Sequence, residues 1–248
     1  APMIPTCFLL ITIASGALEA FTSGNDLYLA GNYQGAIAAY ESAVAESSQT
    51  AEIFYNMGNA YYKLGDKPRA ILYYEKSLSL SPRSMDARSN LKRAKDELPL
   101  TDEEKLLVSE SFRGTPVVNR FTLDESSIIF FWAYIPFTLF LFLTVSIQGK
   151  WRQRFAAASI LLFFVTLILG FLLLMRYLDS RNKYGILLVQ RIELREGPEN
   201  TAPPAATSFG GLKARLSESL DAHGETWHKV ELPNGQTGWV KDSSLGII

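Results

Sequence analysis

The sequence is poor in the residues that build disulfides, metal sites and catalytic centres. Its single cysteine, Cys7, excludes an intrachain disulfide. Its two histidines, His223 and His228, have no nearby cysteine or acid pair, so we expect no metal site and no cofactor. Neither sign of charge dominates: the formal net charge is −1, which argues against nucleic acid as a partner. The chain also lacks Gly-x-Ser-x-Gly, His-Glu-x-x-His and phosphate-loop motifs, so we expect no enzymatic activity.

Charge is also missing from two apolar runs in the middle of the chain. Residues 127–147 and residues 155–175 contain no Asp, Glu, Lys or Arg. About 20 apolar residues are needed to cross the hydrocarbon core of a bilayer, and both runs meet this length. We therefore expect two transmembrane helices, with Pro136 tolerated as a kink in the first. The alternative is two buried helices of a soluble domain, but helices that are apolar on every face are rare outside lipid.

The loop between the two runs, residues 148–154, carries Lys150, Arg152 and Arg154 and no acid. It is too short to be a domain, so the two helices must run antiparallel and both soluble regions must share one compartment. The positive-inside rule places the loop in the cytoplasm, although further cations follow the second run. An apolar segment in residues 1–20 resembles a secretory signal and favours export of the N-terminal region. A buried first helix is the alternative for that segment.

Residues 17–98 contain an internal repeat, in which identical residues recur 34 positions apart. The matching pairs are Gly24/Gly58, Asn25/Asn59, Gly31/Gly65, Ala36/Ala70, Ile37/Ile71, Tyr40/Tyr74 and Glu41/Glu75. This period is that of the tetratricopeptide repeat, a pair of packed helices. We expect two units, residues 17–50 and 51–84, followed by a capping helix, residues 85–98. Because three repeats are usually needed for stability, docking on a neighbour or self-association is expected to supply the missing contacts.

The first helices of such units line a concave groove. Repeat positions place these residues on that face: Asn25, Tyr28, Tyr55, Asn56, Asn59, Tyr62, Asn90 and Arg93. Amides and a cation there can hold a peptide backbone or a C-terminal carboxylate, so we expect proteins or peptides as partners. For any single asparagine, the alternative is a common repeat residue that touches no partner.

The C-terminal part of the chain has the pattern of a small β-domain. After a charged linker, residues 99–126, in which "TDEE" predicts a short helix, strand-like residues occupy 184–248. Asn234-Gly235 is a hairpin turn signal between the alternating strand 227–232 and the return strand 238–241. Short strands with such turns suggest a small barrel.

This region resembles a bacterial SH3-like domain. The residues that carry the resemblance are Leu194, Arg195, Gly197, Pro198, Trp227, Val230, Asn234, Gly235, Gly238, Trp239, Val240, Leu245 and Ile248. The resemblance implies binding of peptides or cell-wall fragments by exposed aromatic residues, with Trp227, His228 and Trp239 as the candidate surface. For Trp239 a core position is the alternative. His228 follows a core tryptophan on strand alternation, so we expect it to be exposed.

Repeats, a two-span hairpin and an SH3-like region in this order resemble the BatE family of bacterial aerotolerance operons. The resemblance covers nearly the whole chain. It implies a multi-pass protein of the bacterial inner membrane, with both soluble regions in the periplasm. Its implied partners are Bat proteins with von Willebrand A domains and a MoxR-type ATPase, and its implied role is in aerotolerance or envelope stress.

The sequence thus predicts a multidomain membrane protein. Its parts are an all-α tetratricopeptide solenoid, a two-helix transmembrane hairpin and a small all-β SH3-like barrel. The predicted function is that of a non-enzymatic scaffold. The alternative is a cell-wall sensor or anchor whose SH3-like module grips peptidoglycan.

Overall fold

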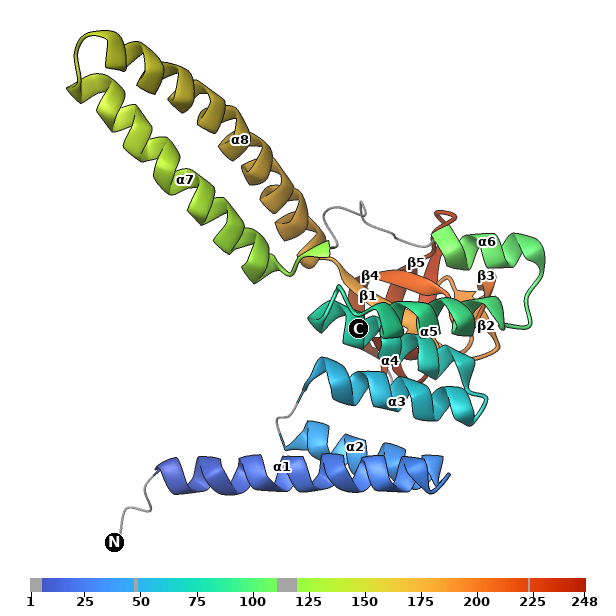
Figure 1. The fold of residues 1–248 in the computed structure, drawn as a ribbon. Coiled ribbons are helices and arrows are strands. Elements are labelled where there is room, and N and C mark those ends of the chain that lie inside the picture. Colours follow the sequence, from blue (N-terminus) through green and yellow to red (C-terminus); the bar gives the residue numbers. More distant parts are fainter. Residues whose placement is uncertain (1–5, 47–48, 111–119, 223) are drawn as a thin grey trace, which may run out of the picture. The chain divides into compact units, whose positions relative to one another are not determined.

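The computed structural model of the protein describes residues 6–46, 49–110, 120–222 and 224–248 (Figure 1). The chain forms two compact units, residues 1–112 together with 183–248, and residues 113–182. Within the described residues, the first unit contains helices followed by an antiparallel sheet, and the second contains two long helices.

The helical part of the first unit consists of paired helices joined by tight turns. Its elements are α1 (Thr6–Leu29), α2 (Tyr33–Ala45), α3 (Ala51–Lys63), α4 (Lys67–Leu80), α5 (Met85–Asp96) and α6 (Asp102–Glu110). Gly31 and Gly65 end the first helix of each pair with φ of 79° and 84°, a conformation that favours glycine. The side chains of Asn32, Thr50 and Asp66 cap the next helices. The predicted 34-residue repeat is therefore visible as two equivalent helix pairs.

Glycine and tyrosine set the spacing inside each helix pair. A Cβ on Gly24 would lie 2.4 Å from the ring of Tyr40, and a Cβ on Gly58 would lie 2.6 Å from the ring of Tyr74. Both rings are about 1% exposed. The two helices of a pair approach this closely because the first helix has a glycine, without a side chain, at the point where the tyrosine ring of the second helix packs against it.

The segments flanking the repeats agree in part with expectation. The predicted capping helix is α5, and the short helix predicted in the linker is α6, which Thr101 and Glu104 cap reciprocally. The part of the linker at 111–119 and the first five residues lie outside the described residues. From Thr6 onward the signal-like segment is helical and continuous with the first helix of the repeats. Its role in export stays a prediction.

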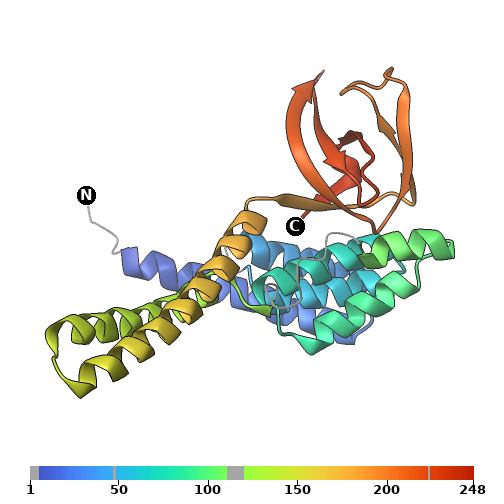
Figure 2. The same ribbon diagram turned by 90° about the horizontal axis from the view of Figure 1, so that it is seen from above.

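Seven antiparallel strands form the C-terminal sheet. They are β1 (Lys183–Leu187), β2 (Arg191–Arg195), β3 (Pro204–Phe209), β4 (Lys213–Ala222), β5 (Glu225–Glu231), β6 (Thr237–Lys241) and β7 (Leu245–Ile247). The strand order is β3-β2-β6-β5-β4-β1-β7, and the sheet is curved (Figure 2). The predicted hairpin is confirmed: Glu231 pairs with Thr237, and Gly235 has a φ of 82°.

The sheet is open, which corrects the expectation of a closed barrel. Its edges are β3 and β7, and these two strands are not paired with each other. The turn before Lys213 lies at Gly210 and Gly211, and Gly211 has a φ of 89°. A Gly-Gly pair is a turn signal in itself, so this turn was readable from sequence.

The sheet shares a hydrophobic core with the second repeat. Buried residues of α4 and α5 form one cluster with buried residues of all seven strands, β1 to β7. A Cβ on Gly246 would lie 2.3 Å from Leu72 Cδ2, and Gly211 lies against Leu98 and Ile71. Glycines on the sheet therefore permit contact with the helices at van der Waals distance, and the solenoid packs against the chain's own sheet.

The second unit is a helical hairpin of α7 (Leu123–Ser146) and α8 (Lys150–Ser180). Both helices are long and apolar enough to cross a membrane. Phe137 packs on Phe163, and Phe140 packs on Phe155, so the two helices run antiparallel. Helix α8 begins at Lys150, inside the predicted loop 148–154, so residues 147–149 alone separate the two helices, and the limits of the membrane spans stay a prediction.

Candidate partner-binding groove

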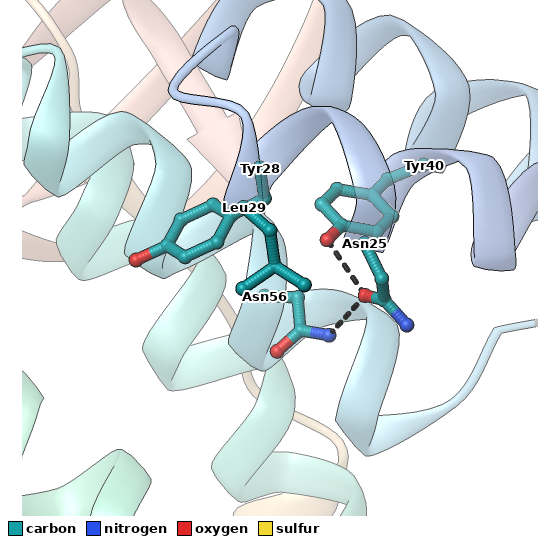
Figure 3. A pocket seen from close by; sticks show the side chains of 5 residues that line it. All are labelled: Asn25, Tyr28, Leu29, Tyr40 and Asn56. Atoms are coloured by element: carbon teal, nitrogen blue, oxygen red, sulfur yellow. Dashed lines mark hydrogen bonds between the residues drawn. The ribbon is translucent and has the colours of Figure 1, made fainter.

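A pocket of about 260 Å³ lies on the first repeat (Figure 3). It is lined by Asn25, Tyr28 and Leu29 of α1, Tyr40 of α2 and Asn56 of α3. Leu29 is 83% exposed, so its side chain is open to a partner. The pocket thus combines amides, tyrosine rings and one exposed aliphatic side chain, which suits a peptide better than a small charged molecule.

A hydrogen-bond network holds the amides of this pocket in place. The Oδ1 atom of Asn25 accepts a hydrogen bond from Tyr40 Oη at 2.8 Å and another from Asn56 Nδ2 at 3.0 Å. Figure 3 shows both bonds meeting at the same oxygen. Burial, followed by the nearby Tyr28, raises the pKa of Tyr40 to about 12, so its hydroxyl remains a donor at physiological pH.

The same network recurs one repeat further along the chain. Asn59 Oδ1 accepts a hydrogen bond from Tyr74 Oη at 2.8 Å and from Asn90 Nδ2 at 2.9 Å. Asn90 Nδ2 also lies 3.2 Å from Tyr55 Oη. Each repeat therefore uses one asparagine to bind its own tyrosine and the first helix of the next unit.

Each step of this network leaves one donor and one acceptor without a partner among the described residues. In the first step these atoms are Asn25 Nδ2 and Asn56 Oδ1, and in the second they are Asn59 Nδ2 and Asn90 Oδ1. An extended peptide presents an N–H and a C=O from every residue, which is the complementary pattern. The amides are thus both structural and available.

Two of the predicted groove residues lie outside both the pocket and the networks. Tyr62 donates a hydrogen bond to Glu97, and Lys67 Nζ lies 3.4 Å from the centroid of the Tyr62 ring. Arg93 is exposed on α5. The structure brings together Asn25, Tyr28 and Asn56 at the pocket. The second network contains the other predicted residues, Tyr55, Asn59 and Asn90.

The candidate aromatic surface of the C-terminal sheet is buried. Trp227, His228 and Trp239 are 2%, 5% and 8% exposed, so the expectation that His228 is exposed is wrong. The physical reason is that both ring nitrogens have partners: Nδ1 lies 2.8 Å from Ser219 Oγ, and Nε2 lies 2.9 Å from Asp242 Oδ1. Strand alternation did not show this, because Asp242 comes from the turn after β6.

Sequence reasoning also missed a charge cluster between the helices and the sheet. Glu75 on α4 lies 3.0 Å from Lys95 on α5 and 3.4 Å from Lys213 on β4. Burial alone raises the pKa of Glu75, but the two lysines outweigh burial and lower this pKa to about 2. The repeat pattern pairs Glu75 with Glu41 but carries no signal for a lysine far along the chain.

Paired helices with a 34-residue period define a helical-repeat protein. Comparisons with known proteins agree: residues 24–65 match the family described as TPR repeat, and residues 51–84 match the family described as Tetratricopeptide repeat. The heat shock protein STI1 of Saccharomyces cerevisiae is 34% identical over 84 residues, which is 31% of this chain. The match spans 14% of the yeast protein's length. The chain therefore contains tetratricopeptide repeats.

Proposed function

We propose that the protein is a non-enzymatic, membrane-anchored scaffold that binds extended peptide segments of partner proteins. The observation that carries this proposal is the repeated network in the groove. Asn25 and Asn56 in one step, and Asn59 and Asn90 in the next, each leave a donor and an acceptor for a peptide backbone. Such a series recognises backbone first, so specificity must come from side-chain contacts such as the one offered by Leu29.

The groove also favours backbone over a terminal carboxylate. None of the five residues that line the pocket carries a charge, so nothing there neutralises a carboxylate. The hydroxyl of Tyr40 and the amide of Asn56 already donate to Asn25. A neutral, hydrogen-bonding site of this kind suits an internal peptide segment with an apolar side chain beside Leu29.

The membrane anchor in this proposal is the hairpin of α7 and α8, whose length and composition permit both to span a bilayer. The short cationic link supports a hairpin tip in the cytoplasm and both soluble regions in the periplasm. The resemblance in domain order to BatE supports partners among Bat proteins, including those with von Willebrand A domains. The sheet is proposed as an SH3-like module that completes the solenoid. Burial of Trp227 and Trp239 leaves the cell-wall alternative without the exposed aromatic surface it requires.

Selection of peptides from a random library on the full-length protein in nanodiscs tests the groove. The informative variant is Leu29→Glu, which changes an exposed pocket residue without touching the amide network. We expect it to weaken the selected peptides by at least about tenfold, because it removes one apolar side-chain contact. The matched control is Leu80→Glu, which changes a 47% exposed leucine on α4 outside the pocket. Equal binding by both variants, or no enriched peptide at all, would refute the proposal.

Cysteine labelling in spheroplasts tests the topology. In a chain with Cys7 replaced by serine, single cysteines at the exposed positions Gln49 and Thr201 should react with an impermeant maleimide from outside. A cysteine at the exposed Gln153 in the hairpin tip should react only after permeabilisation. Labelling of Gln49 and Thr201 from opposite sides would exclude a hairpin.

A further inference from the structure

The tip of the helical hairpin carries an unbalanced positive charge. Lys150, Arg152 and Arg154 are all exposed within the first turns of α8. The sequence contains no Asp or Glu between Glu125 and Asp179, so the hairpin supplies no nearby acid. None of the three cations has an ion pair among the described residues. Their field is therefore cancelled by nothing in the hairpin itself.

The opposite end of the hairpin is different. There Arg176 Nη1 lies 3.4 Å from Asp179 Oδ2, and the start of α7 contributes Asp124 and Glu125. Charges of both signs are mixed at that end. Among the described residues of the hairpin, the charges at the tip are all of one sign.

The helix dipoles contribute little to the positive electrostatic field at the tip. The C-terminus of α7 and the N-terminus of α8 are separated by only residues 147–149, so their partial charges of opposite sign lie close together. The side chains therefore determine the field at this end. Three cations without counter-charges beside apolar helices repel one another and attract anions.

An aromatic side chain, Trp151, lies among the cations of the tip. Trp151 is 59% exposed, stacks on Phe155 with centroids 6.2 Å apart, and has the guanidinium carbon of Arg154 at 4.9 Å from its ring centroid. Tryptophan is enriched where a membrane's headgroups meet its hydrocarbon. In a membrane-embedded hairpin, Trp151 thus places the guanidinium of Arg154 at headgroup depth.

We propose that this tip, defined by Lys150, Trp151, Arg152 and Arg154, binds the phosphate groups of anionic phospholipids in the leaflet it reaches. The inference rests on the proposed membrane hairpin. Each cation near an anionic surface strengthens attraction by about fivefold at moderate salt. Three cations together therefore favour anionic over zwitterionic headgroups more strongly than one cation would. Their contacts with the headgroups also position the hairpin in the leaflet.

The test uses the full chain in vesicles of phosphatidylcholine with a minor fraction of phosphatidylglycerol. Spin-labelled phosphatidylglycerol and phosphatidylcholine report how strongly each lipid associates with the protein. We expect the wild type to prefer phosphatidylglycerol by about fivefold or more at low salt, with the preference falling as salt rises. The variant Lys150→Gln/Arg152→Gln/Arg154→Gln should lose most of this preference.

Two controls identify the cause. The charge-conserving variant Lys150→Arg/Arg152→Lys/Arg154→Lys should keep the preference. The variant Arg176→Gln/Arg181→Gln, which removes cations at the opposite end, should keep it too. An unchanged preference in the triple glutamine variant, or an equal loss in the opposite-end variant, overturns the inference.

Resistance to extraction by alkaline carbonate separates this inference from the proposal on which it rests. Protein that stays in the membrane but shows no lipid preference disproves headgroup binding alone. Protein that is extracted disproves the membrane hairpin, and the headgroup inference with it.

Discussion

Replacing Glu75 by glutamine is expected to loosen the packing of the sheet against the second repeat. The carboxylate lies between Lys95 of α5 and Lys213 of β4, and the three side chains are only 15%, 14% and 16% exposed. One carboxylate on α4 therefore joins two neighbouring elements. Glutamine keeps the shape of the side chain but removes its charge, which leaves two largely buried ammonium groups without an acid.

The size of the effect follows from the pKa of Glu75. Burial raises this pKa, but attraction to Lys95 and Lys213 outweighs burial and lowers it from 4.5 to about 2. At about 1.36 kcal/mol per pH unit, this difference corresponds to about 3 kcal/mol of stabilisation by the ionised form. Breaking a buried pair by removing one partner costs about 3–5 kcal/mol, which is the same order. We expect Glu75→Gln to lower the free energy of unfolding by about 3 kcal/mol near neutral pH.

The pH dependence has a definite sign. The pKa of Glu75 is lower in the folded protein than in the unfolded chain, so the folded state gains stability where the group is ionised in both states. This contribution is complete above the unfolded pKa of 4.5 and disappears as the pH falls towards about 2. The difference in unfolding free energy between wild type and variant should therefore shrink across that interval.

Equilibrium urea unfolding of the full chain in detergent micelles measures both effects. Trp227 and Trp239 are buried in the sheet, so their fluorescence follows its exposure to solvent. The control is Glu225→Gln, which removes an exposed pair with Lys241 on the same sheet and should change stability little. The reasoning is refuted if the two variants behave alike, or if the effect of Glu75→Gln does not depend on pH between 4.5 and 2.

Three further predictions concern the packing of the repeats and the sheet. Tyr74→Phe should lower the unfolding free energy by about 1 kcal/mol, because it removes the hydrogen bond from the tyrosine hydroxyl to Asn59 Oδ1. An unchanged urea unfolding curve would show that this bond is not formed. Gly58→Ala should cost about 1–3 kcal/mol, because its Cβ would lie 2.6 Å from the ring of Tyr74; a thermal melt identical to wild type would contradict this packing. Gly246→Ala should likewise destabilise the chain, because its Cβ would lie 2.3 Å from Leu72 Cδ2, and faster amide exchange in β7 should report the displacement.

The sequence was informative wherever a contact repeats or is local. Gly24, Asn25 and Tyr40 recur at a constant offset, so their pattern predicted the helix pairs before any contact was known. The apolar runs predicted α7 and α8, and Asn234-Gly235 predicted the β5–β6 hairpin. The hydrogen bonds of the asparagines were harder to predict. The repeat position of Asn25 predicted that it faces a groove, and it lines a pocket, but the position did not predict that its oxygen accepts two hydrogen bonds.

Contacts between distant segments were not visible in the sequence. Glu75 and Lys213 are brought together by the docking of the sheet, and no periodicity relates them. His228 looked exposed because alternation describes one strand at a time. Its partners Ser219 and Asp242 come from a neighbouring strand and from the following turn, and together they make a buried position acceptable for a polar ring.

Packing of the sheet against the helices accounts for the stability of a solenoid with so few repeats. A third repeat would add a full helix pair after α4, whereas here the capping helix α5 is the last helix that continues the repeat pattern. The chain's own sheet packs on buried residues of α4 and α5, and its Gly246 lies against Leu72 of α4. The same helix carries Tyr74, which belongs to the shared core and also holds Asn59 in the groove. Packing of the sheet and geometry of the second amide network thus depend on one helix, so a substitution that loosens the sheet should also disturb the amides proposed to bind a peptide.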